Sequence, residues 1–210
     1  SNVNANGGFG ETMFTLREMS TRNKNMIKLF LSTPCYGGVC LDKYATSIIK
    51  LQLELMREGI QLYLDTTENE SLVHRARNVS VGRYMQKTDC DFFMFVDADI
   101  DFDPKSIVRL VRANRDISVG CYPKKTVMWE QAKAAVEKGD ERDMSMLSSS
   151  LVINFGATNR PVEDGMIEIL DGPTGFMCIK RSVFKKLEDE FPELWCKNDH
   201  QNRDFDDYHA

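Results

Sequence analysis

The sequence predicts an α/β protein whose centre is a mostly parallel sheet covered by helices. Apolar segments with the length of strands alternate with segments in which apolar residues recur every three or four positions. This alternation is typical of parallel strands joined by helices. The uninterrupted apolar run at 92–96 has the character of a buried strand, and a chain of 210 residues is long enough to enclose one such sheet.

The first half of the chain contains the regular part of this pattern. The expected strands are at 28–33, 61–65, 92–96 and 117–122. The expected helices are at 41–58, 71–87 and 103–114. Gly59 is a typical helix C-cap, so the first of these helices should end there.

The second half is less regular, and its sheet connections are harder to predict. Residues 124–150 are charged without a clear strand, so we expect them to cover the sheet as helix and loop. Two further strands, which the pattern allows to be antiparallel, are expected at 151–155 and 166–170. The segment 181–191 has helical spacing, with Val183, Phe184 and Leu187 directed inward.

Composition excludes several classes of function. The net charge of −5 provides no general electrostatic attraction for nucleic acid, and no apolar run approaches the length of a membrane span. The six cysteines contain no C-x-x-C pair, which argues against a zinc site and favours reduced thiols in the cytoplasm. We expect one domain at 26–210, preceded by a polar, glycine-rich extension at 1–25.

Four aspartates follow the apolar run 92–96, at every second position. In an extended strand Asp97 and Asp99 share one face, and ligands of open α/β sheets bind beyond the carboxyl ends of strands. Two convergent carboxylates favour a hard divalent cation between them, and such cations commonly carry substrate phosphates. The alternative is an acidic turn before a helix, an interpretation we accept for Asp103 as N-cap and Pro104 as first helical residue.

The acidic pair and several other motifs resemble, in content and order, GT-A-fold glycosyltransferases that use nucleotide sugars. The signature of that family is an Asp-x-Asp at a strand end, matched here by Asp97-Ala98-Asp99. The resemblance covers roughly residues 27–190. The other matching segments are Leu31-Ser32-Thr33-Pro34, Asp65, Arg75-Ala76-Arg77-Asn78, Tyr122-Pro123-Lys124-Lys125 and 174–180.

The resemblance implies a Rossmann-like, mixed and mostly parallel sheet, with the nucleotide-sugar half at about 26–123 and the acceptor half at about 124–210. It implies Mn²⁺ or Mg²⁺ as the cofactor. It also implies transfer of a sugar from a donor such as UDP-glucose or UDP-rhamnose to a glycan or glycoprotein. More narrowly, the chain is similar to a glycosyltransferase domain of chlorella-infecting viruses, which decorate their capsid glycoprotein. A location in the host cytoplasm would follow.

In this resemblance several strand ends and one helix would hold the donor. Asp65 would accept a hydrogen bond from uracil or ribose, and Tyr36 would stack on the base. An arginine would orient the diphosphate better than a lysine, because its guanidinium binds two oxygens at once. Arg77 is a further candidate, although a solvated helix face explains it equally well. The expected donor-binding residues are Thr33, Pro34, Tyr36, Asp65, Arg75, Asn78, Asp97 and Lys124.

The residues that would perform the reaction are less clearly marked. The expected metal ligands are Asp97, Asp99 and His209. Asp171 or Asp207 would act as the base that takes the proton from the acceptor hydroxyl. The Glu-Asp pair that usually does so in the family is not assigned in this sequence. Trp129 and Trp195 would stack on acceptor sugars or belong to the hydrophobic core.

Two other functions compete with this interpretation. A nucleotidyltransferase of similar layout usually holds its triphosphate with a basic residue in a glycine-rich first loop, and residues 33–38 contain no Lys or Arg. A non-catalytic module that binds a nucleotide sugar or a glycan within a larger protein would share the donor site. Turnover of a nucleotide sugar separates that module from an enzyme.

Overall fold

The computed structural model describes residues 26–68, 72–122, 153, 154, 156, 161–196, 207 and 208, and single positions at 129, 133 and 137. The expected extension 1–25, most of the charged segment 124–150 and most of the expected strand 151–155 lie outside the described residues. None of the helices in the described part of the chain combines the length and the apolar character that crossing a membrane requires.

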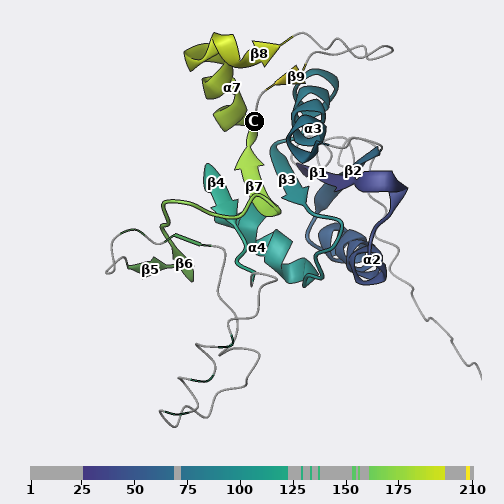
Figure 1. Ribbon diagram of the computed structural model, residues 1–210, viewed down its shortest axis with the longest axis vertical. Coiled ribbons are helices and arrows are strands. Elements are labelled where there is room, and N and C mark those ends of the chain that lie inside the picture. Colours follow the sequence, from purple (N-terminus) through teal and green to yellow (C-terminus); the bar gives the residue numbers. More distant parts are fainter. Residues whose placement is uncertain are drawn as a thin grey trace, which may run out of the picture.

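A five-stranded sheet forms the centre of the molecule, in the order β2-β1-β3-β7-β4 (Figure 1). Its strands are β1 (Ile27–Cys35), β2 (Ile60–Glu68), β3 (Phe92–Val96), β4 (Ile117–Val119) and β7 (Phe176–Lys180). β1 pairs in parallel with β2 and with β3, whereas β7 pairs antiparallel with β3 and with β4. All strands except β7 therefore point the same way. The expected mixed, mostly parallel, Rossmann-like sheet is confirmed.

Helices cover both faces of this sheet. They are α2 (Asp42–Arg57), α3 (Val73–Lys87), α4 (Pro104–Ala113) and α7 (Arg181–Glu190). One hydrophobic cluster joins α2 and α4 to one face, and a second joins α3 and α7 to the other (Figure 1). Each expected helix is confirmed to within two residues at either end.

The two clusters explain why the run 92–96 is uninterrupted in its apolar character. Side chains alternate between the faces of a strand, so Met94 lies in the cluster with α2 and α4, and Phe93 in the cluster with α3 and α7. The Phe93 ring lies 5.1 Å from that of Tyr84 and 5.7 Å from that of Phe184, measured between centroids. All five residues of β3 are buried, because both faces of this strand are covered.

Three expected strand ends were wrong by three residues. β2 does not end at Asp65 but continues to Glu68, because β1 remains paired with it as far as Cys35. β4 ends at Val119, not at 122, because its partner β7 begins only at Phe176. The expected strand 166–170 is confined to Met166–Ile167, which is β6 and pairs with β5 (Val162–Glu163) in a short hairpin.

The predicted helix ends are confirmed. The Asp103 carboxylate accepts a hydrogen bond from the Lys105 N–H at 3.0 Å, and Pro104 is the first residue of α4. Gly59 follows the end of α2 with φ of 66°, which favours glycine. The remaining short elements are η1 (Tyr36–Gly38), η2 (Pro192–Leu194), β8 (Trp195–Cys196) and β9 (Asp207–Tyr208).

Candidate functional site

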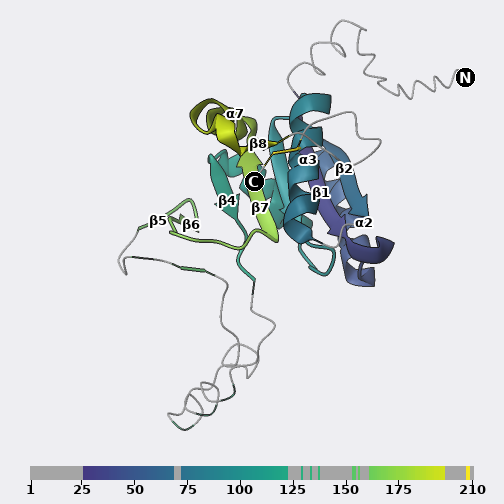
Figure 2. The ribbon, with the colours of Figure 1, turned by 45° about the horizontal axis from the view of Figure 1, so that its top comes forward.

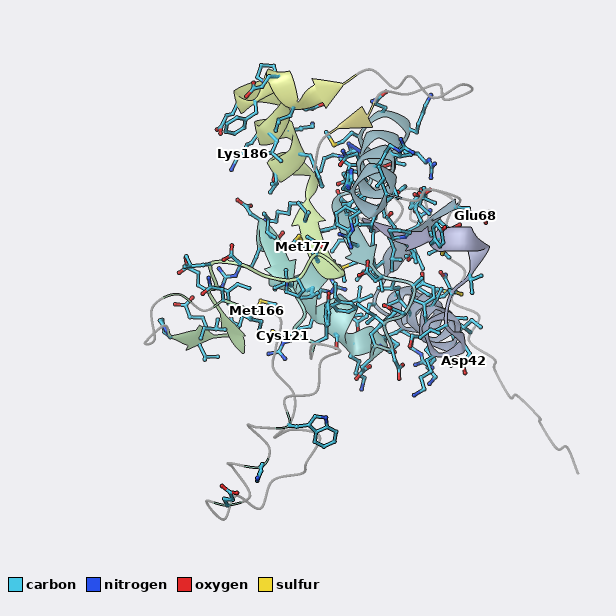
Figure 3. The ribbon with its side chains drawn as sticks, in the orientation of Figure 1. Asp42, Glu68, Cys121, Met166, Met177 and Lys186 are labelled. Atoms are coloured by element: carbon cyan, nitrogen blue, oxygen red, sulfur yellow. The ribbon has the colours of Figure 1, made fainter. Side chains whose placement is uncertain are left out.

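Five chain segments meet at one edge of the sheet. The carboxyl ends of β1, β2 and β3 share this edge because these strands are parallel. β7 runs the other way, so it begins here, with Phe176 opposite Val96. β4 ends here, with Val119 opposite Met177, a residue labelled in Figure 3. In open α/β sheets this is the edge where ligands bind.

Arg77, in α3, connects the end of β3 with the start of β7. Its Nη2 donates to Asp97 Oδ1 at 2.8 Å, and its Nη1 donates to Thr174 Oγ1 at 2.8 Å. Its side chain is only 17% exposed and lies over the Phe95 ring, with Cζ 5.5 Å from the ring centroid. The solvated helix face considered for Arg77 is therefore excluded. An ion pair this shielded orients the Asp97 carboxylate more firmly than an exposed pair would.

At Gly175 the backbone lies close to both Asp97 and Tyr122, beside this ion pair. Its carbonyl oxygen accepts a hydrogen bond from the Asp97 N–H at 2.9 Å. A Cβ at this position would lie closer than 3.0 Å to both Asp97 Oδ2 and Tyr122 Oη. Burial and the negative charge of Asp97 raise the pKa of Tyr122, while a hydrogen bond with the Gly175 backbone opposes the increase. The Tyr122 hydroxyl is therefore protonated at neutral pH and can donate a hydrogen bond to an anionic group.

The loop that follows Asp97 is anchored on the start of α2. The Leu41 N–H donates to the Ala98 carbonyl oxygen at 2.9 Å. Ser47 Oγ donates to Asp101 Oδ1 at 3.1 Å, so this carboxylate points at α2. The four aspartates therefore differ in their surroundings. Asp97 pairs with Arg77, Asp99 is exposed, Asp101 anchors the loop on α2, and Asp103 caps α4.

The expected donor-binding residues at the end of β1 differ in how exposed they are. Thr33 is buried, and its hydroxyl lies 2.5 Å from that of Tyr44 in α2. Burial raises the pKa of Tyr44 to about 12. Pro34 is half-buried, and Tyr36 is 74% exposed beside the edge. Tyr36 is therefore available for stacking on a ligand, whereas the Thr33 hydroxyl is already engaged by Tyr44.

Asp65 is held by α3. It accepts a hydrogen bond from Ser80 Oγ at 2.9 Å and forms an ion pair with Arg83, and its side chain is 11% exposed. Its charge is thus balanced within the fold. A role in binding uracil or ribose remains a prediction.

One of the three candidates in the helix motif 75–78 reaches the acidic strand end. Arg75 and Asn78, both expected to bind the donor, are half-buried and buried, respectively. Arg77 is the member of this motif that reaches the acidic strand end. Direct contact with Thr174, 97 residues further on, could not be inferred from helical spacing.

The other expected site residues are less well placed by the structure. Asp171 is exposed, and its Oδ2 accepts a hydrogen bond from Asn154 Nδ2 at 2.9 Å. Asp207 lies in β9, paired with Cys196 of β8, and Lys124 and His209 lie outside the described residues. Trp129 is exposed, as an acceptor-stacking residue would be. Among the described residues, no group of three His, Cys, Asp or Glu side chains could hold a metal ion.

Sequence reasoning missed three members of this site: Tyr122, Thr174 and Gly175. All three lie in segments that match the family resemblance, but none was assigned a role of its own. A glycine placed just before a buried strand is a sign of close backbone approach. The identity of the approaching groups depends on the pairing of β3 with β7, which the sequence did not reveal.

The fold and this site define an α/β protein with an acidic, arginine-paired site at the carboxyl edge of a Rossmann-like sheet. No protein-family model matches the chain, and no curated protein matches it. Among solved structures, the chain is similar to the crystal structure of A197 from STIV. The two share 20% identity, with a TM-score of 0.44, over 77% of this chain and 68% of that chain. A likeness at this level carries no argument about function.

Proposed function

We propose that the chain is a metal-dependent glycosyltransferase of the GT-A type, which moves a sugar from a UDP-sugar to a glycan acceptor. The observation that carries the proposal is the pairing of Asp97 with Arg77 beside the exposed Asp99, at the sheet edge where nucleotides bind. The resemblance to the domain of chlorella-infecting viruses, and a location in the host cytoplasm, are part of this proposal.

The residues present fit a hard divalent cation. Asp99 offers an exposed carboxylate, and Asp97 offers its second oxygen while Arg77 holds the first. Oxygen donors of this kind suit Mn²⁺ or Mg²⁺. We propose that Asp99 holds the ion, and that Asp97 contributes directly or through a water molecule. When bound, the ion would stabilise the negative charge that develops on the departing diphosphate.

The side chains around the ion would orient the donor. Arg77 keeps the Asp97 carboxylate in place. The protonated Tyr122 hydroxyl would donate a hydrogen bond to a diphosphate or sugar oxygen. Tyr36 is exposed for stacking on uracil. Asp171 is our first candidate for the base, because its carboxylate is exposed and lies three residues before Thr174. A base must come within hydrogen-bond reach of the acceptor hydroxyl.

Calorimetric titration with UDP-glucose tests the donor site. We expect heat of binding in the presence of Mn²⁺, loss of that heat with EDTA, and weaker binding of GDP-glucose. Equal binding with and without metal would contradict the metal role of the aspartates. Absence of binding in both conditions, in a chain shown to be folded by circular dichroism, would contradict the donor site itself.

Replacing Gly175 with alanine should weaken this binding about tenfold or more. The added Cβ would lie closer than 3.0 Å to Asp97 and Tyr122, so at least one of these groups must move, and an overpacked site typically costs roughly 1–3 kcal/mol. Gly172→Ala is the matched control, because its Cβ would meet Val119 and Ile169 instead. The control should lose stability but retain affinity. Equal loss of affinity in both variants would argue against the close approach at Gly175.

A non-catalytic nucleotide-sugar module is the second candidate, and one observation favours it. The carboxylate of Asp171, the first candidate for the base, already accepts a hydrogen bond from Asn154. Release of UDP from UDP-glucose in the presence of glycan acceptors separates the two functions. Metal-dependent donor binding without any UDP release would favour the binding module.

A further inference from the structure

Two free cysteines flank the turn that joins β1 to α2. Cys35 is the last residue of β1 and is buried, whereas Cys40 is exposed and lies two residues before the start of α2. Helix α2 lies beside β1 and β2 (Figure 2). Because the turn follows the carboxyl end of β1, both thiols lie at the edge of the sheet that carries the acidic site.

The turn between the two cysteines has the geometry that closes a hairpin. Its central residues, Gly37 and Gly38, have φ of 65° and 70°. The Val39 N–H donates to the Tyr36 carbonyl oxygen at 3.4 Å. A four-residue turn with positive φ at both central positions is of type I′, which reverses the chain so that its flanking residues lie side by side. The two cysteines directly flank this turn.

This geometry brings the two cysteines within the span of a disulfide bond. Residues just outside the closing hydrogen bond of such a turn form a pair without hydrogen bonds between them, with Cα atoms about 4.5 Å apart. Disulfide bonds connect Cα atoms that are roughly 4.4–6.8 Å apart.

The hydrogen bond that follows the turn agrees with this placement. β1 and β3 are parallel, and their register, continued by three residues, puts Cys35 at the level of Ala98. The Leu41 N–H donates to the Ala98 carbonyl oxygen at 2.9 Å. The chain after the turn has therefore returned to the level of Cys35 when it reaches Cys40 and Leu41.

The two thiols also act on each other electrostatically. Burial, and then the charges of Cys40 and Glu68, raise the pKa of Cys35. Glu68, labelled in Figure 3, is the residue of β2 that pairs with Cys35. Tyr44, in the first turn of α2, has a pKa raised mainly by burial and also by the charges of both cysteines. The exposed thiol, Cys40, is the one that a dissolved oxidant reaches first.

We propose that Cys35 and Cys40 are a redox-sensitive thiol pair, which a low-molecular-weight disulfide such as glutathione disulfide oxidises to an intramolecular disulfide across the turn. The Cys40 thiolate attacks one sulfur of glutathione disulfide, so a mixed disulfide forms, and one glutathione leaves with the proton that Cys40 lost. The Cys35 thiolate then attacks the Cys40 sulfur, and the second glutathione leaves with the proton from Cys35. The protein loses two electrons and two protons, which glutathione disulfide gains as two thiols. Disulfide bonds of cytosolic proteins are usually transient and either catalytic or redox-sensing.

The disulfide would act on the acidic site through Leu41. Cys35 is only 6% exposed, so closing the bond draws Cys40 inward and disturbs the hydrogen bond from the adjacent Leu41 to Ala98. Ala98 is the central residue of the Asp-x-Asp motif. We expect oxidation to weaken UDP-glucose binding about fivefold, the usual effect of losing one hydrogen bond. This effect rests on the proposed function, whereas formation of the bond does not.

Oxidation of the full chain with glutathione disulfide, followed by blocking with N-ethylmaleimide and tryptic mass spectrometry, tests the bond. Cleavage after Lys28 and Lys43 leaves both cysteines in one peptide, 29–43. We expect this peptide to lose two hydrogen atoms and to take up no maleimide, and to take up two after treatment with dithiothreitol. Cys40→Ser should abolish the bond. Cys121→Ser is the matched control, because Cys121 is also an exposed free cysteine, and this variant should still form the bond.

A glycine variant tests whether the turn brings the thiols together. In Gly37→Val a β-branched residue is strained at φ of 65°, and the added Cβ meets no other group within 4 Å, so only the turn should change. Gly59→Val is the matched control, with φ of 66° and the same open surroundings at the far end of α2. We expect Gly37→Val to slow formation of the bond by about tenfold or more, and Gly59→Val to leave the rate unchanged.

The outcomes separate the disulfide from the proposed function. A peptide 29–43 that keeps two free thiols, or that carries only glutathione adducts, would overturn the thiol pair, as would equal rates in the two glycine variants. Unchanged affinity for UDP-glucose after complete oxidation would overturn the effect on the acidic site. If the reduced chain binds no UDP-glucose, the proposed function fails, while the mass of the peptide still decides whether the bond forms.

Discussion

Replacing Asp99 with alanine is expected to abolish Mn²⁺-dependent binding of UDP-glucose while leaving the fold intact. Asp99 is exposed at the carboxyl edge of the sheet, so its removal leaves no cavity in the core. The proposed ion would lose its main carboxylate ligand. Since even the groups that support metal ligands contribute 10–100-fold, we expect affinity to fall by at least about 100-fold. Calorimetric titration in Mn²⁺ measures this loss directly.

Asp101→Ala is the control for Asp99→Ala. Asp101 belongs to the same acidic run, but its carboxylate accepts a hydrogen bond from Ser47 and anchors the loop on α2. Its removal should change the net charge equally and reduce stability by about 1 kcal/mol, with only a small effect on donor affinity. If Asp99→Ala binds the donor as well as the wild-type chain does, the metal-site argument fails. If both variants lose affinity equally, general charge and not ligation is responsible.

Replacing Arg181 with methionine should cause the largest loss of stability among the changes considered. The Arg181 guanidinium donates to the carbonyl oxygens of Tyr84 at 2.9 Å and Cys90 at 2.8 Å, and to that of Thr88. It also lies over the Tyr84 ring, 4.4 Å from the centroid. The last carbonyl groups of a helix have no partner within the helix, and here Arg181 supplies one for the end of α3.

Loss of this guanidinium would remove the side-chain donor of the Thr88 and Cys90 carbonyl groups just after α3, whereas the Tyr84 carbonyl would keep its hydrogen bond from the Thr88 hydroxyl. We expect the free energy of unfolding to fall by about 3 kcal/mol, because each unsatisfied buried acceptor costs roughly 1–3 kcal/mol. For a chain of this size the melting temperature should fall by roughly 6–12 °C. Thermal and urea unfolding measure both quantities.

Two further variants give this prediction its controls. Arg181→Lys should recover only part of the loss, because a single ammonium group cannot reach separate carbonyl groups as a planar guanidinium does. Arg115→Met removes an exposed arginine whose partner Glu163 lies 3.9 Å away, and it should change stability by less than about 0.5 kcal/mol. A similar small change in Arg181→Met would show that water replaces the guanidinium at the end of α3.

The fold was predictable from local patterns to a large extent. Helices with an apolar face, such as α4, were found because helical spacing and capping residues are encoded in adjacent positions. The continuous apolar character of β3 indicated burial on both faces, which the two core clusters confirm. Strand ends were less well predicted, because a strand continues for as long as its neighbour offers hydrogen bonds. β2 extends to Glu68 for this reason.

The sequence by itself determined that four aspartates follow a buried strand and that arginines lie on the preceding helix, since both features are contiguous in the chain. Tertiary structure decided what each of them contacts. Antiparallel β7 lies between β3 and β4, and this places Gly175 and Tyr122 beside Asp97. Arg77 bonds both Asp97 and Thr174, the residue two positions before β7. Such contacts depend on strand order and register. Which distant segments pair is decided by their packing in three dimensions, and the local pattern of one segment does not specify its partner.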